Sequence, residues 1–180
     1  KRPMQPLLDA LSSIGAECNS TDGKPPVKIK GSIAGGDVTI PGNLSSQFIS
    51  SLLITAPLTK NGINLTIQGD LVSKPYLDAT IRTMREFGVS VQTLIPYKKY
   101  NISPQIYKNT TFKIPIDFSS LALLLSSIVL SGEDVTIKGS IGNLPQGDEA
   151  FIDFLNQLGV LVTINENEIK IKSPEKLKGG

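Results

Sequence analysis

Two groups of polar side chains stand where the sequence predicts that helices begin. Residues 42–48, GNLSSQF, place two serines and an amide before an apolar run, and residues 71–78, LVSKPYLD, place Ser73 and Lys74 before a proline. The first turn of a helix has unpaired backbone N–H groups and a partial positive charge, which attract phosphate and carboxylate groups. An ordinary helix cap needs a single hydroxyl. The surplus of donors therefore predicts an anion-binding site.

A third helix start lies at the beginning of the chain, where Arg2 precedes Pro3, a residue favoured in the first helical turn. If the three helix starts converge, they form one pocket of dipoles, hydroxyls and cations suited to a small polyanion. Each helix start taken singly is explained as well by ordinary capping, so the prediction rests on the three together. The predicted binding residues are Arg2, Ser45, Ser46, Gln47, Ser73 and Tyr76.

The composition restricts the chemistry that this chain can perform. None of its 180 residues is histidine, which excludes Ser-His and Cys-His catalysis and histidine-bearing metal sites. No acidic cluster has the spacing of a carboxylate metal site, so we expect no metal. The single Cys18 is expected to be an inert thiol in a reducing compartment, and we expect a cytoplasmic protein. A net charge of +2 and apolar stretches too short to span a bilayer predict neither nucleic-acid nor membrane binding.

An internal repeat predicts the elements that position the polar residues. Residues 61–91 align with residues 131–162, with three glycines in matching positions. Each copy contains an alternating strand, a glycine, a loop, a helix and a second strand that follows Gly-Val-x-Val. One face of the helix in the second copy is expected to consist of Phe151, Phe154, Leu155 and Leu158. A partial third copy begins the chain with a helix whose apolar positions are Met4, Leu7, Leu8 and Leu11.

Further helices are expected over residues 46–56, before Pro57, and over residues 118–130. Each unit then reads strand, helix, strand, helix, strand, strand, and Val27–Ile29 with Val38–Ile40 exemplify the closing strand pair. Connections of this length favour parallel pairing, with helices on one face of the sheet. The sequence thus predicts an α/β fold built from repeated βαβαββ units.

These segments resemble the family of 5-enolpyruvylshikimate-3-phosphate (EPSP) synthases, also called 3-phosphoshikimate 1-carboxyvinyltransferases. The resemblance covers nearly the whole chain, and its most specific motifs are SSQF and SKPY in this order and spacing, beside KRPMQPLLDAL and QGDEAFIDFLNQLGV. It implies the enolpyruvyl transferase fold, an inside-out α/β barrel of βαβαββ units in two domains. The resemblance implies that residues 1–115 belong to the first domain, which binds shikimate 3-phosphate. It implies that residues 116–180 form the first unit of the second domain.

The resemblance also implies a reaction, in which the enolpyruvyl group of phosphoenolpyruvate is transferred to the 5-hydroxyl of shikimate 3-phosphate and phosphate is released, on the route to chorismate and the aromatic amino acids. The resemblance implies that the reaction uses no metal or organic cofactor. It also implies that the intact enzyme is a monomer. By motif, Ser45, Ser46 and Ser73 contact the 3-phosphate. Gln47 lies between the substrates and Tyr76 flanks the shikimate ring. Arg2 binds phosphoenolpyruvate as a permanently charged fork.

The chain departs from the family pattern in the segment DFSSLALLLSS, where Asp117 is either a hinge or, as the favoured interpretation, a helix cap. No residue matches the family's acid and base positions, so the catalytic residues are unassigned and we expect the isolated 180-residue chain to be an inactive portion of a longer enzyme. Two alternatives remain open. One is a non-catalytic anion-binding repeat module, and the other is a relative of UDP-N-acetylglucosamine enolpyruvyl transferase, which shares the fold but lacks the two motifs.

Overall fold

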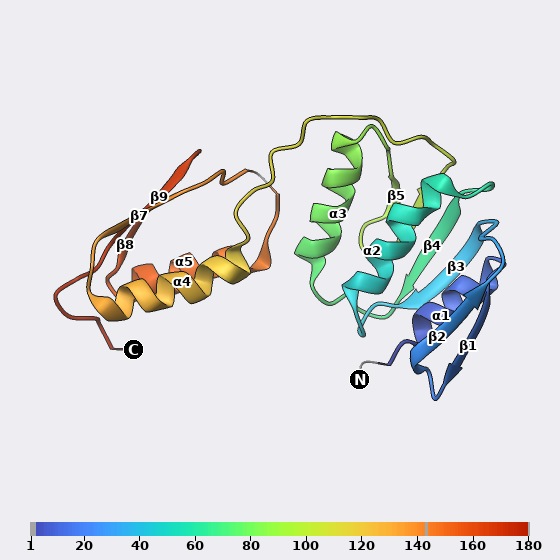
Figure 1. Ribbon diagram of the computed structural model, residues 1–180, viewed down its shortest axis with the longest axis horizontal. Coiled ribbons are helices and arrows are strands. Elements are labelled where there is room, and N and C mark those ends of the chain that lie inside the picture. The colour runs from blue at the N-terminus through green and yellow to red at the C-terminus, as the bar shows by residue number, and fades with distance from the viewer. Residues whose placement is uncertain (1–2, 143, 180) are drawn as a thin grey trace. The chain divides into compact units, whose positions relative to one another are not determined.

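A computed structural model of the protein describes residues 3–142 and 144–179 (Figure 1). The chain divides into two compact units, residues 1–110 and 111–180, each with its own hydrophobic core. The elements of the first unit are α1 (Gln5–Ser13), β1 (Glu17–Thr21), β2 (Lys24–Lys30), β3 (Gly36–Pro41), α2 (Ser46–Thr55), η1 (Ala56–Leu58), β4 (Ile63–Gln68), α3 (Lys74–Glu86), β5 (Gln92–Ile95) and β6 (Lys99–Ile102). Those of the second are α4 (Phe118–Ser131), β7 (Val135–Lys138), η2 (Gly147–Glu149), α5 (Ala150–Gln157), β8 (Leu161–Asn165) and β9 (Glu168–Lys172). The domain boundary expected from the sequence lies slightly later, after residue 115, and the assignment of these units to two domains stays a prediction.

The four-stranded sheet of the first unit has the order β3-β4-β6-β5. The element order from β3 to β6 is the predicted strand, helix, strand, helix, strand, strand. The lengths of the connections favour parallel pairing, but among the described strands of this sheet only β3 and β4 pair in parallel. The reason is that β6 returns from β5 as a hairpin and inserts between β4 and β5, so it is antiparallel to both. Helices α2 and α3 lie side by side over one face of this sheet (Figure 1).

The second unit repeats this arrangement. Its sheet has the order β7-β9-β8, with β9 antiparallel to both neighbours, as β6 is in the first unit. The topological match confirms the repeat that the sequence predicts. The segment before α4, which the repeat predicts as an opening strand, has no assigned strand over residues 103–117.

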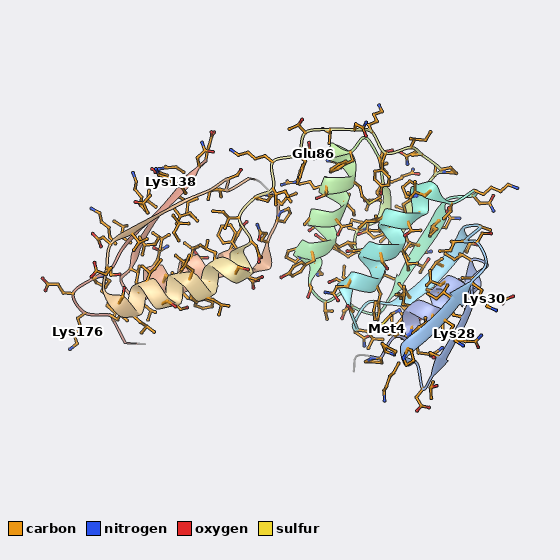
Figure 2. The ribbon with its side chains drawn as sticks, in the orientation of Figure 1. Met4, Lys28, Lys30, Glu86, Lys138 and Lys176 are labelled. Carbon is orange, nitrogen blue, oxygen red and sulfur yellow. The ribbon has the colours of Figure 1, made fainter. Side chains whose placement is uncertain are left out.

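The beginning of the chain forms α1 followed by the β1–β2 hairpin, a helix and two strands that correspond to the end of a unit. The predicted pairing of Val27–Ile29 with Val38–Ile40 is wrong. The strand that contains Val27 pairs with β1 in a two-stranded sheet, whereas Val38 belongs to β3, which opens the next unit. Because a tight turn joins β1 to β2, β1 is the nearer pairing partner for β2. Figure 2 shows Lys28 and Lys30 on β2, and both are exposed.

Apolar residues of the helices and sheets form the two cores. In the first, Leu53 on α2 and Leu77 on α3 are fully buried together with Ile40 and Ile67 on the sheet. In the second, Leu125 on α4 packs with Ile152 and Leu155 on α5, and with β9. The predicted inward face of α5 is wrong at Phe154, which is 59% exposed, because the helix turns Ile152 inward instead. No helix among the described residues is long and apolar enough to cross a membrane.

Candidate functional site

The parallel pairing of β3 and β4 places two loops at the same edge of the sheet. These strands are in register up to their last residues, Pro41 and Gln68, and each continues through a short loop into a helix. The backbones of the loops are joined, since the Gly42 N–H donates to the Gln68 carbonyl at 2.8 Å and the Val72 N–H donates to the Gly42 carbonyl at 3.1 Å. The N-termini of α2 and α3 are therefore neighbours.

An open pocket of about 790 Å³ lies at these helix starts. Five of the six predicted binding residues line it, namely Ser45, Ser46, Gln47, Ser73 and Tyr76. The sixth, Arg2, lies outside the described residues, but Pro3 lines the pocket. The described lining carries no charged side chain, so within it hydroxyls, an amide and helix N-termini are the groups that can attract an anion.

Ser45 is the N-cap of α2, as the sequence suggests for one of the two serines. Its Oγ accepts a hydrogen bond from the Gln47 N–H at 3.3 Å. An oxygen that accepts in this way still has its own proton to donate to a ligand. Ser46 follows at the first helical position and is only 8% exposed, so its hydroxyl is a second polar group beside the cap.

Ser73 precedes α3 in a different way. Its backbone is left-handed, with φ 58° and ψ 47°, and its side chain makes no cap hydrogen bond. The Ser73 carbonyl instead accepts from the Tyr76 N–H at 3.1 Å. The expectation of an ordinary cap is wrong here, because Ser73 has a left-handed backbone and its side chain makes no cap hydrogen bond, and Ser73 lines the pocket.

Further hydroxyls that sequence reasoning missed join the two helices inside the pocket. The Thr80 Oγ1 donates to the Tyr76 carbonyl and lies 2.8 Å from the Ser50 Oγ. Since the Thr80 proton is engaged, Ser50 donates to Thr80, and α2 is tied to α3. Helical spacing could have identified both residues, because Ser50 stands four positions after Ser46 and Thr80 four after Tyr76.

The charged residues at the start of α3 point to a neighbouring turn. The Lys74 Nζ lies 5.2 Å from the centroid of the Tyr97 ring, a cation–π distance. The Tyr97 Oη donates to the Asp78 Oδ2 at 2.9 Å, and this hydrogen bond to a carboxylate raises the pKa of the Tyr97 phenol above 10.0. Lys74 and Asp78 are thus both engaged with Tyr97.

Asp117 caps α4, which confirms the favoured interpretation of this residue. Its carboxylate accepts from the N–H groups of Ser119 and Ser120, both at 3.2 Å, and from the Ser120 hydroxyl at 2.5 Å. The Ser120 hydroxyl contributes most to lowering the pKa of the Asp117 carboxyl. In the part of the chain that the structure describes, no cluster of His, Cys, Asp or Glu could bind a metal ion, and Cys18 is a free thiol.

Solved structures with the same fold are enolpyruvyl transferases. The EPSP synthase from Acinetobacter baumannii matches with a TM-score of 0.71 and 26% sequence identity, over 99% of this chain and 41% of that one. The enolpyruvyl transferase NikO from Streptomyces tendae matches with a TM-score of 0.70 over 99% of this chain and 44% of that one, and its 16% identity shows the fold alone. The predicted fold class is confirmed.

Sequence comparisons identify the family. The family model described as EPSP synthase (3-phosphoshikimate 1-carboxyvinyltransferase) matches residues 1–180, and this chain belongs to the EPSP synthase family. It is 78% identical, over 180 residues, to the 3-phosphoshikimate 1-carboxyvinyltransferase of Nitrosopumilus maritimus. It is 38% identical, over 184 residues, to the enzyme of the same name from Methanosphaera stadtmanae. The matches cover 100% and 99% of this chain but 43% of each relative, so the chain spans less than half of their length.

Proposed function

We propose that this chain forms the shikimate 3-phosphate-binding part of an EPSP synthase. The proposed reaction transfers the enolpyruvyl group of phosphoenolpyruvate to the 5-hydroxyl of shikimate 3-phosphate and releases phosphate. One observation carries the proposal: the SSQF residues, together with the serine and tyrosine of SKPY, line a single pocket at two helix N-termini, in a chain that matches the family over its whole length.

The geometry suits a phosphate group. Ser45, Ser46 and Ser73 supply hydroxyls from two loops that the parallel strands hold together, and the α2 and α3 N-termini add partial positive charge. These fixed donors need little rearrangement when the phosphate arrives, which favours binding. Gln47, beside the two serines, would lie between the substrates, and Tyr76 would flank the shikimate ring.

Phosphoenolpyruvate would lie next to this phosphate, so two anions must be held side by side. Arg2 is proposed as its binding residue, because a guanidinium offers paired donors to a carboxylate or phosphate. Pro3, the next residue in the sequence after Arg2, lines the pocket, and this supports the assignment. The acid and base of the reaction stay unassigned, and the proposal includes no metal, no organic cofactor and a monomeric cytoplasmic enzyme.

Isothermal titration calorimetry of shikimate 3-phosphate tests the assignment. Ser46→Ala is expected to weaken binding by about 1 to 3 kcal/mol, the range for losing a hydrogen bond to a charged group. Ser13→Ala is the matched control, because Ser13 also lies in a helix of the first unit but its hydroxyl donates to the Ala10 carbonyl and it does not line the described pocket. The affinity of this variant should equal that of the wild type. Equal affinities of the two variants would refute the phosphate role of Ser46.

The two alternatives differ in measurable ways. A non-catalytic anion-binding module would bind shikimate 3-phosphate or inorganic phosphate, but the complete protein would release no phosphate from the substrate pair. A UDP-N-acetylglucosamine enolpyruvyl transferase would use that nucleotide sugar as its acceptor. The names of the curated relatives favour the EPSP synthase reaction over both.

A further inference from the structure

The segment from Gly69 to Asp78 carries Ser73 and Tyr76 into the pocket, and its conformation needs support. The left-handed backbone of Ser73 is unfavourable for a serine and persists only where surrounding contacts fix it. The Ser73 hydroxyl makes no cap hydrogen bond that would supply this support. The backbone bonds from the Tyr76 N–H to the Ser73 carbonyl and from the Val72 N–H to the Gly42 carbonyl hold the segment in part, and contacts from another part of the fold add to them.

The turn between β5 and β6 contacts the segment at both ends. At the far end, the Tyr97 Oη donates to the Asp78 carboxylate at 2.9 Å, and within the segment the Tyr97 ring lies 5.2 Å from the Lys74 ammonium. At the near end, the Lys98 ammonium donates to the Gly69 carbonyl and lies 3.6 Å from the Asp70 carboxylate. Ser73 and Tyr76 lie between these two points of attachment.

The turn is itself anchored to the core. Tyr97 has a left-handed backbone, with φ 57°, and its N–H donates at 2.9 Å to the phenol oxygen of Tyr100, which is only 3% exposed. The Lys98 carbonyl accepts from the N–H of Ile67 on β4 at 2.8 Å. The turn is thus joined by a hydrogen bond to the strand that leads into the segment.

We propose that Tyr97 and Lys98 are positioning residues that hold Ser73 and Tyr76 in place for the phosphorylated substrate. Neither residue lines the pocket, so each acts through the segment that it binds. The identity of the ligand rests on the proposed function, whereas the support of the segment does not.

The first test compares two tyrosine variants that each lose one hydroxyl. Tyr97→Phe removes the bond to Asp78 but keeps the ring that faces Lys74. Tyr107→Phe is the matched control, because its hydroxyl donates to the Ile54 carbonyl at 2.9 Å, eight residues after Ser46 on α2. Ile54 also lines the pocket, so this control removes a tyrosine hydroxyl bond beside the pocket but outside residues 69–78. Affinity for shikimate 3-phosphate should fall about threefold to tenfold in Tyr97→Phe, the size of one net hydrogen bond, and stay unchanged in Tyr107→Phe. Asp78→Asn keeps an acceptor oxygen for Tyr97 and should retain nearly the wild-type affinity.

The second test needs no ligand. Amide hydrogen exchange in Tyr97→Phe should become at least threefold faster at Ser73, Lys74 and Tyr76, and stay unchanged at the start of α2. Tyr107→Phe should leave the exchange at these three amides unchanged. If the wild-type protein binds no shikimate 3-phosphate, the proposed function fails, and the exchange rates still decide the positioning role. Exchange at the three amides that is the same in Tyr97→Phe and in the wild type would overturn the inference.

Discussion

The Ser45 hydroxyl accepts a hydrogen bond from the Gln47 N–H, which leaves its proton available to a ligand. Thr80 has a comparable double role, because its hydroxyl donates to the Tyr76 carbonyl and accepts from Ser50. At the scale of single residues, one oxygen thus serves both the local backbone and a neighbour. Replacing such a residue therefore affects the shape of the pocket as well as its donors.

Gly42 allows the two pocket loops to approach each other. A methyl group added there would lie 2.7 Å from the Ile67 Cγ2, 3.0 Å from the Asp70 carbonyl oxygen and 3.1 Å from the Leu71 Cα. Its backbone is not left-handed, so the cost of a substitution comes from this close approach. We expect Gly42→Ala to lower the free energy of unfolding by about 1 to 3 kcal/mol, as overpacking does, and to weaken phosphate binding.

Urea unfolding and calorimetry on the same preparation measure both effects. Gly179→Ala is the control, because an added methyl at that position meets no atom within 4 Å. If Gly42→Ala matched that control in stability and in affinity, the loops would not be in the close contact described.

The hydroxyl and glycine pattern around residues 42–48 predicted where α2 begins and which side chains share the pocket. The motif at residues 73–76 likewise predicted that Ser73 lines the pocket, but it could not predict the left-handed backbone of Ser73, which serine seldom adopts. Nor could it find Tyr97 and Lys98, because their contacts with the pocket segment join residues about 20 to 30 positions apart, beyond any local motif.

At the scale of elements, alternating strands and helices predicted the βαβαββ order correctly but not the pairing within the sheet. Periodicity reports which side of a strand is buried, whereas the position of a hairpin strand depends on contacts between distant strands. Strand β6 lies between β4 and β5, and β9 likewise lies between β7 and β8. The repetition of this insertion in both units shows that it belongs to the unit itself.

The start of α4 gives a pH-dependent prediction. Hydrogen bonds from Ser120 and Ser119 lower the pKa of the Asp117 carboxyl below its ordinary value of 3.8. A carboxyl whose pKa is lower in the folded than in the unfolded state stabilises the fold above its ordinary pKa, and this contribution is lost as the pH falls through the folded value. We expect the stability of the second unit to decrease below about pH 4.

Asp117→Asn isolates this contribution. Asparagine is also a favoured N-cap but does not titrate, so the variant should lose less stability than the wild type between neutral and acidic pH. Chemical denaturation at a series of pH values measures the difference. Parallel curves for both proteins would show that Asp117 contributes nothing to the pH dependence.

Across the whole molecule, the proposed binding groups lie in the first unit, and three acidic or basic residues that could be considered for catalysis are engaged in other contacts. Asp117 caps α4, Asp148 accepts a hydrogen bond from Ser119, and Lys74 faces the Tyr97 ring. The proposed reaction must remove a proton from a hydroxyl and deliver one to a vinyl carbon, which requires positioned acids and bases.

We therefore expect a polypeptide of residues 1–180 to release no phosphate from shikimate 3-phosphate and phosphoenolpyruvate. The chain spans 43% of the length of its curated relatives, and much of the barrier lowering in such reactions, on the order of 7 to 11 kcal/mol, comes from holding both reactants in one closed site. A phosphate-release assay with both substrates measures this, on a sample whose mass confirms its 180 residues. Ser46→Ala serves as the background control, because it removes a proposed phosphate contact. Turnover above that background would assign catalysis to residues within this chain, and Asp148 and Lys74 would be the first to replace.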